Sequence, residues 1–118
     1  MSDATTTVQE LRNAMQRFVS ERQWERYHAP KNLVMGLAIE TAELMEHFLW
    51  LDVEESRQRG ADPRCRKAIA DELADVTCYV LALANCLQLD LSQAVFAKLQ
   101  KNAAKYPVEQ YRGRFETE

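Results

Sequence analysis

The stretch LVMGLAIETAELMEHFLWL, residues 33–51, decides the fold class of this chain of 118 residues. Projected on a helical wheel at about 100° per residue, its apolar side chains cover almost the whole circumference. One narrow sector remains, and it holds Gly36, Glu40, Glu43 and His47. A helix that is apolar on nearly every side is buried on nearly every side. We therefore expect a helical subunit that associates with other copies and whose acidic sector lines a cleft.

Helical patterns continue on both sides of this stretch. Asp62-Pro63 has the form of an N-cap followed by a first helical residue, and Asp90 opens D-L-S-Q, a sequence related to the capping box. Residues 52–60 form a charged extension that ends in glycine. The sequence predicts four helices joined by short loops, over residues 8–27, 30–51, 63–87 and 91–105. Four such helices favour an all-α, four-helix bundle.

The composition indicates one globular domain. Apolar residues make up 47% and charged residues 28%, and the net charge of −3 is too small to indicate nucleic acid or a membrane surface as a partner. The most apolar stretch, residues 76–87, is shorter than the ~20 residues that a membrane span needs, and no signal peptide precedes it. We expect a single domain over residues 1–118, with a core over about 8–106 and a tail over 107–118.

Three cysteines, Cys65, Cys78 and Cys86, lack the spacing of a zinc site. Cys78 and Cys86 are eight residues apart in one predicted helix, which is too far along its axis for a disulfide. Reduced cysteines are typical of the cytoplasm, where we expect this protein to act.

Two predicted helices each carry an acidic pair three residues apart. The pairs are Glu40-x-x-Glu43 and Glu72-x-x-Asp75, and Tyr79 shares the sector of the second pair. Residues at this spacing have Cβ atoms about 5–6 Å apart on one helix face, so four converging carboxylates repel unless a cation lies between them. Mg²⁺ fits best because it takes oxygen ligands and bridges carboxylates to substrate phosphates; Mn²⁺ is its natural substitute.

The acidic pairs have two other interpretations. A single E-x-x-E pair in a soluble helix is usually a solvated face, but two pairs beside largely apolar surfaces on neighbouring helices argue against it. A di-iron bundle requires two E-x-x-H repeats. Only residues 25–28 have that form, and the chain has two histidines in all.

Basic and aromatic residues leave alternatives open. Lys98, Asn102 and Lys105 follow i, i+4, i+7 and share one helix face, which suits a polyphosphate but also an ordinary solvated surface. Trp24 and Trp50 lie at helix ends, where their rings can stack on a nucleobase or pack in a subunit interface. His28 can contact a base edge or cap a helix, and His47 has no evident role.

Four segments taken together resemble a known family. They are RQWERYHAPKNL at residues 22–33, ETAELMEHFLW at 40–50, DELADVTCY at 71–79 and KLQKNAAKYPV at 98–108. In this order and spacing, over about residues 10–108, they resemble the all-α nucleoside triphosphate pyrophosphohydrolases, the MazG-like group, and within it the dCTP pyrophosphatase branch.

The resemblance implies a Mg²⁺-dependent hydrolase that converts a nucleoside triphosphate to its monophosphate and pyrophosphate, and that assembles as a homotetramer, a dimer of dimers. As catalytic metal ligands it implies Glu40, Glu43, Glu72 and Asp75. As substrate-binding residues it implies Trp24, His28, Trp50, Tyr79, Lys98, Asn102, Lys105 and Tyr106. dCTP or a modified dCTP is the expected substrate, in nucleotide-pool sanitation. The alternatives are another triphosphate, such as dUTP or a damaged purine nucleotide, and a helix-bundle module that binds a nucleotide or protein without turnover.

Overall fold

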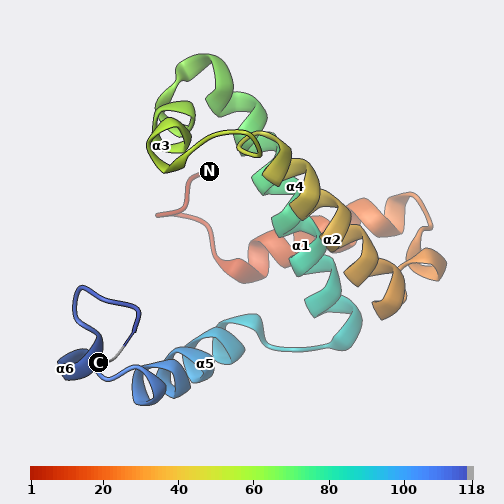
Figure 1. Ribbon diagram of the computed structural model, residues 1–118. Coiled ribbons are helices and arrows are strands. Elements are labelled where there is room, and N and C mark those ends of the chain that lie inside the picture. The colour runs from red at the N-terminus through yellow and green to blue at the C-terminus, as the bar shows by residue number, and fades with distance from the viewer. Residues whose placement is uncertain (117–118) are drawn as a thin grey trace. The chain divides into compact units, whose positions relative to one another are not determined.

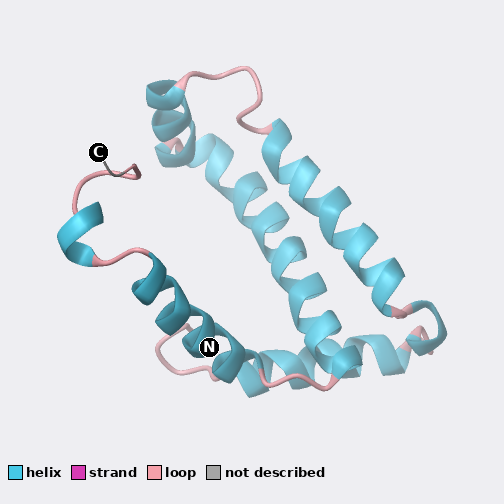
Figure 2. Ribbon diagram, turned by 60° about the horizontal axis from the view of Figure 1, so that its bottom comes forward, coloured by secondary structure: helices cyan, strands magenta, loops and turns pink. Residues whose placement is uncertain are grey.

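The computed structural model describes residues 1–116, and every regular element within them is helical (Figure 1). The elements are α1 (Val8–Glu21), the 3₁₀ helix η1 (Glu25–Tyr27), α2 (Pro30–Glu46), α3 (Val53–Ala61), α4 (Pro63–Leu87), α5 (Leu91–Lys105) and α6 (Val108–Tyr111). Short loops join them (Figure 2). The predicted all-α class is therefore confirmed.

The chain divides into two compact units, which we call the first unit (Met1–Gln88) and the second unit (Leu89–Glu118). In the first unit α2 packs mainly against α4, and α1 and α3 pack against α4 as well. The buried apolar residues among those described are Val19, Leu33, Leu81, Ala82 and Ala84. The long helix α4 is thus the element around which the first unit is built. A single domain over residues 1–118 with a core over 8–106 stays a prediction.

Acidic caps set where several helices begin. The side chain of Asp62 accepts a hydrogen bond from Arg64 N, with Pro63 at the first position of α4, and Asp90 accepts one from Gln93 N at the start of α5. Both caps agree with the sequence pattern, since a side-chain oxygen satisfies an N–H that has no partner within the helix. At the other end of α4, Gln88 takes the left-handed conformation, with a φ of 54°, and stops the helix.

The predicted count of four helices is not confirmed. Helix α1 ends at Glu21 because Gln23 has a φ of 53°, and η1 follows it. Helix α2 ends at Glu46, after which residues 47–51 form turns with bonds such as Phe48 N to Met45 O at 2.9 Å. Residues 52–60 do not extend α2, because Asp52 and Glu55 form a capping box that starts the separate helix α3. The region predicted as a tail contains α6.

Many large apolar side chains of the first unit remain accessible to solvent. On α2, 51% of Val34, 57% of Met35 and 58% of Ile39 is exposed. This agrees with the wheel of α2, which carries apolar residues on more faces than one copy of the chain covers. Within residues 1–116 no single helix is long and apolar enough to cross a membrane, and α4 and α5 meet the length and composition criteria only when counted together.

Candidate metal and nucleotide site

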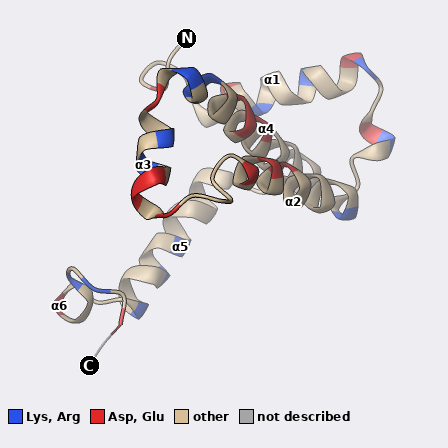
Figure 3. Cartoon of the chain, turned by 45° about the horizontal axis from the view of Figure 1, so that its top comes forward, with Lys and Arg blue, Asp and Glu red and all other residues tan. Residues whose placement is uncertain are grey.

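The acidic residues of α2 and α4 meet in the first unit, where the two helices pack together (Figure 3). One carboxylate oxygen each from Glu40, Glu43 and Glu72 can be chosen so that all three lie within 4.8 Å of one another. Asp75 lies one turn beyond Glu72 on α4, close enough to raise the pKa of Glu40 and Glu72 by charge repulsion. The structure therefore brings the two predicted acidic pairs to one place.

Burial and repulsion act on these carboxylates together. The pKa of Glu40 and that of Glu72 lie above the ordinary value of 4.5. Loss of hydration is the largest cause, and the neighbouring carboxyl of Glu43 is the next. Glu40 Oε2 and Glu72 Oε2 are buried, and neither has a hydrogen-bond partner among the described residues. Buried polar atoms without partners are costly in a folded protein. These two oxygens are consequently free to accept a further partner.

A divalent cation fits this set of donors. The three clustered groups offer only carboxylate oxygens, which are the ligands of hard cations such as Mg²⁺, Mn²⁺ and Ca²⁺ rather than of zinc or iron–sulfur centres. A bound cation would give Glu40 Oε2 and Glu72 Oε2 the partner that the chain does not supply. Binding metal is therefore a role that these residues can perform.

His47 lies beside the acidic cluster. Its positive form opposes the effects that raise the pKa of Glu72. The backbone carbonyl of His47 accepts a hydrogen bond of 3.0 Å from Arg59 Nη1 of α3, which ties the end of α2 to the next helix. His47 therefore belongs to the surroundings of Glu72. The helical wheel placed it in the acidic sector but indicated no role for it.

A pocket of about 220 Å³ adjoins the acidic residues within the first unit. It is lined by Met15, Phe18, Trp24, His28, Glu40, Asp75 and Tyr79. The rings of Phe18 and Trp24 meet edge to face with centroids 5.9 Å apart. Met15 and Phe18 were not identified from the sequence as site residues, because nothing in their spacing separates a pocket wall from a core residue.

His28 lies between this pocket and a second cavity of about 190 Å³ lined by residues of α1, η1 and α4. Its backbone N–H donates to Glu25 O at 3.0 Å, and its carbonyl accepts from Cys86 Sγ at 3.0 Å. The backbone of His28 thus ends η1, and His28 is also among the residues that line the pocket. The two interpretations left open by the sequence are compatible.

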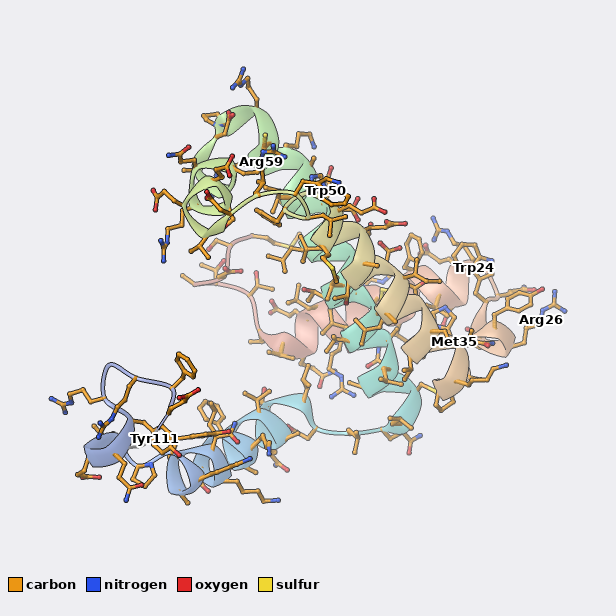
Figure 4. The ribbon with its side chains drawn as sticks, in the orientation of Figure 1. Trp24, Arg26, Met35, Trp50, Arg59 and Tyr111 are labelled. Carbon is orange, nitrogen blue, oxygen red and sulfur yellow. The ribbon has the colours of Figure 1, made fainter. Side chains whose placement is uncertain are left out.

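The two tryptophans have different surroundings. Trp24 lines the pocket beside the acidic cluster, whereas Trp50 is 89% exposed and is not among the residues that line that pocket. In Figure 4 the two side chains lie toward opposite ends of α2. A single copy of the chain therefore does not place both predicted aromatic residues around one ligand.

The predicted phosphate-binding residues belong to the second unit. Lys98 borders a shallow apolar hollow on α5 that Ala94, Val95 and Leu99 complete. Lys105 Nζ lies 5.4 Å from the centre of the Tyr106 ring, and that ring meets Tyr111 of α6 edge to face at 5.1 Å. The backbone carbonyl of Asn102 accepts a hydrogen bond of 2.8 Å from the backbone N–H of Tyr106. Of these residues, Lys105 and Tyr106 are joined with Tyr111 in one basic and aromatic cluster.

Comparison with known proteins gives a consistent picture. The sequence profile of the MazG-like family matches residues 36–116. The chain is 40% identical over 107 residues to dCTP pyrophosphatase 1 from Bos taurus, covering 91% of this chain and 63% of that protein. Against dCTP pyrophosphatase 1 from Homo sapiens it is 40% identical over 101 residues, covering 86% and 59%. The chain thus spans about three fifths of the length of these curated relatives.

A solved structure shares the fold. The crystal structure of a pyrophosphatase from Archaeoglobus fulgidus matches with a TM-score of 0.81 and 33% sequence identity. The match covers 91% of this chain and 98% of the archaeal chain. The helices described above therefore occur in a comparable arrangement in a protein of almost the same extent.

Proposed function

The chain belongs to the MazG-like family, and on that premise we propose that it is a Mg²⁺-dependent nucleoside triphosphate pyrophosphohydrolase. Its proposed substrate is dCTP or a modified dCTP, which it cleaves to the monophosphate and pyrophosphate. The observation that carries the proposal is the cluster of Glu40, Glu43 and Glu72 with two unpartnered oxygens beside an aromatic pocket. Resemblance to dCTP pyrophosphatase 1 supports the choice of base.

Glu40, Glu43, Glu72 and Asp75 are the proposed ligands of Mg²⁺, with Mn²⁺ as a substitute. When bound, the metal offsets the negative charge of the triphosphate and lowers the pKa of bound water. The role of the carboxylates is to hold cations where this charge develops, on two helices whose packing fixes their separation. Removing the mutual repulsion of the four acids also favours the folded state.

The proposed reaction is an attack of water on the α-phosphorus. A bond forms between the water oxygen and phosphorus, the bond to the oxygen that bridges the α- and β-phosphates breaks, and pyrophosphate leaves with that oxygen. A carboxylate that is not saturated by metal accepts the proton of the water, and Glu43 or Glu72 is our candidate.

The nucleoside is proposed to bind in the aromatic pocket. Trp24 supplies a ring for stacking, His28 a polar edge, and Tyr79 a hydroxyl toward the sugar or a phosphate. The pocket of about 220 Å³ is smaller than the ~300–1,000 Å³ typical of ligand sites, so further residues must complete the surroundings of a nucleotide. Trp50 is our candidate for such a residue from another copy.

Lys98, Asn102, Lys105 and Tyr106 are proposed to bind the polyphosphate. A triphosphate carries about four negative charges, which basic side chains offset together with the metal. The three polar residues Lys98, Asn102 and Lys105 lie along one face of α5, at the spacing that lets neighbouring side chains contact one extended anion.

We further propose that the working form is a homotetramer, a dimer of dimers. The exposed apolar residues of α2 and α5 support association, because isolated monomers rarely present so much apolar surface. Nucleotide-pool sanitation is the proposed role. The cytoplasm is the proposed compartment, where the three free cysteines would stay reduced.

Product analysis tests this proposal. The purified protein is incubated with a panel of canonical and modified nucleoside triphosphates, with Mg²⁺ or with a chelator, and the products are separated. We expect monophosphate and pyrophosphate only with Mg²⁺, fastest from dCTP or a modified dCTP. Faster turnover of dUTP or a damaged purine nucleotide would identify that nucleotide as the substrate in place of dCTP. Absence of turnover by a correctly folded protein would favour a binding module instead.

A further inference from the structure

Gly36 lies in the middle of α2, directly against the ring of Tyr79 on α4. A Cβ atom at position 36 would lie 2.5 Å from Tyr79 Cζ and 2.8 Å from Tyr79 Oη, and it would also overlap Cε1. Carbon atoms in van der Waals contact are separated by about 3.5–4.0 Å. Any side chain at position 36 therefore forces the Tyr79 ring to move.

Glycine is unfavourable in the interior of a helix, because it loses more conformational freedom on folding than any other residue. The chain offers an internal comparison in α3, where a Cβ at Gly60 would meet nothing within 4 Å. Gly60 has no packing reason to lack a side chain, whereas Gly36 has one. The close approach of a ring explains why a poor helix former occupies position 36.

The ring that Gly36 accommodates is a wall of the nucleotide pocket. Tyr79 lines this pocket together with Trp24, His28, Glu40 and Asp75. A methyl group at position 36 would displace the ring from α2 by about 1 Å to restore ordinary contact distances. Because the ring is part of the pocket wall, the displacement would change the room left for a ligand.

We infer that Gly36 is a positioning residue for nucleotide binding: by having no side chain, it seats the Tyr79 ring against α2 and keeps the pocket open for the nucleoside. This inference rests on the proposed function, because it assigns the pocket to a nucleotide. Gly36 acts only through Tyr79 and does not alter the carboxylates. Its replacement therefore affects substrate binding and leaves the chemical step unchanged.

The experiment compares Gly36→Ala with Gly60→Ala in the full-length, assembled protein. Both changes replace a helical glycine by alanine, so both gain helix propensity. They differ because only the new methyl group at position 36 meets the Tyr79 ring. We expect Gly36→Ala to raise the KM for dCTP about tenfold, the size of effect that a misplaced methylene has in a binding pocket. The kcat should stay within about twofold of the wild-type value, and Gly60→Ala should change neither constant.

A second arm measures binding without turnover. The probe is a dCTP analogue with a methylene group between the α- and β-phosphorus, titrated calorimetrically in Mg²⁺. Gly36→Ala should weaken its binding about tenfold in the wild-type background and have no further effect in a Tyr79→Ala background. If Tyr79→Ala does not fold, Tyr79→Leu replaces it, because leucine keeps apolar volume but lacks the far end of the ring.

The outcomes separate the two ideas. An equal loss of binding from Gly36→Ala with and without the Tyr79 ring, or a fall in kcat at unchanged KM, would overturn the inference. A wild-type protein that binds the analogue but hydrolyses no nucleotide would overturn the proposed function, and the binding arm would still decide the role of Gly36. A wild-type protein that does not bind the analogue would overturn both.

Discussion

Helices α4 and α5 both combine apolar residues with charged ones, but only α4 finds its packing partners within its own unit. Leu81, Ala82 and Ala84 of α4 are between 4% and 6% exposed. No residue of α5 is buried, and Phe96 remains 69% exposed. The acidic cluster on α2 and α4 is thus assembled by one copy of the first unit, whereas the apolar side chains of α5 remain exposed in one copy of the chain.

This difference separates two kinds of site residue. The proposed metal ligands depend on the packing of α2 against α4, which a single copy provides. The proposed phosphate-binding residues of α5 depend on whatever covers that helix in the assembled protein. Changes to the acidic cluster of the first unit should therefore act directly on chemistry, and changes to the basic face of α5 should act on assembly or on substrate affinity.

The largest expected effect is that of Glu72→Gln. Removing one charged ligand should lower kcat by about 10²- to 10³-fold, because metal ions contribute several kcal/mol of transition-state stabilisation. The folded state should be retained, since Glu72 Oε2 is a buried oxygen without a partner in the chain. Steady-state kinetics in Mg²⁺, with far-ultraviolet circular dichroism as the check on folding, measure both.

Asp71→Asn is the matched control for Glu72→Gln. Asp71 is the preceding residue of α4, is 68% exposed and pairs only loosely with Lys67, at 3.8 Å. Its replacement should leave activity within about twofold of wild type, because exposed ion pairs contribute little. Full activity in Glu72→Gln would contradict the proposed metal site on α2 and α4. It would also contradict the idea that changes to this cluster act directly on chemistry.

The sequence predicted best what depends on neighbours in the chain. The caps Asp62 and Asp90 and the two acidic pairs rest on spacings of a few residues, so they could be identified from the pattern alone. The predicted end of the second helix at residue 51 was wrong, and the charged extension over residues 52–60 is a separate helix, because residues 47–60 still contain helix formers such as Leu49, Glu54 and Glu55. What decides the break is the capping box of Asp52 and the turn before it.

Tertiary contacts account for most of what the sequence did not reveal. Met15 and Phe18 of α1 line the pocket together with residues of α4 because the two helices pack together, and no spacing within α1 encodes this. The contact of Gly36 with Tyr79 joins residues of two helices, and no spacing within either helix encodes it. Trp50 was grouped with Trp24 by residue type, and one copy of the chain does not place them together.

An intermediate effect is expected from Phe96→Ser, which tests the second half of the comparison. If another copy covers α5, replacing this exposed ring should weaken the assembly by about 10- to 100-fold, since burial of a Phe side chain is worth about 1.5–3 kcal/mol. Light scattering over a dilution series should show smaller species at concentrations where the wild type stays assembled. Lys101→Ser, about 140° around the same helix, is the control and should not change the mass.

An unchanged mass in Phe96→Ser would mean that α5 is not an interface between copies. The covering surface would then be a different molecule or the substrate itself. A wild-type protein that is monomeric at all concentrations would exclude the homotetramer outright. In either case the acidic cluster of the first unit would be unaffected, because its residues are brought together within one copy.

The smallest expected effect is that of Lys98→Ala, which asks whether the basic face of α5 contacts substrate at all. Losing one charged contact to a phosphate should raise the KM for dCTP about five- to tenfold with little change in kcat, and added salt should reduce the difference. Lys67→Ala is the control, because Lys67 is 88% exposed and lies in an equally basic segment of the first unit. A comparable rise in KM for both variants would indicate a general attraction between the protein and an anion. A rise confined to Lys98→Ala would show that α5, although it buries none of its residues within one copy, completes the site that α2 and α4 begin.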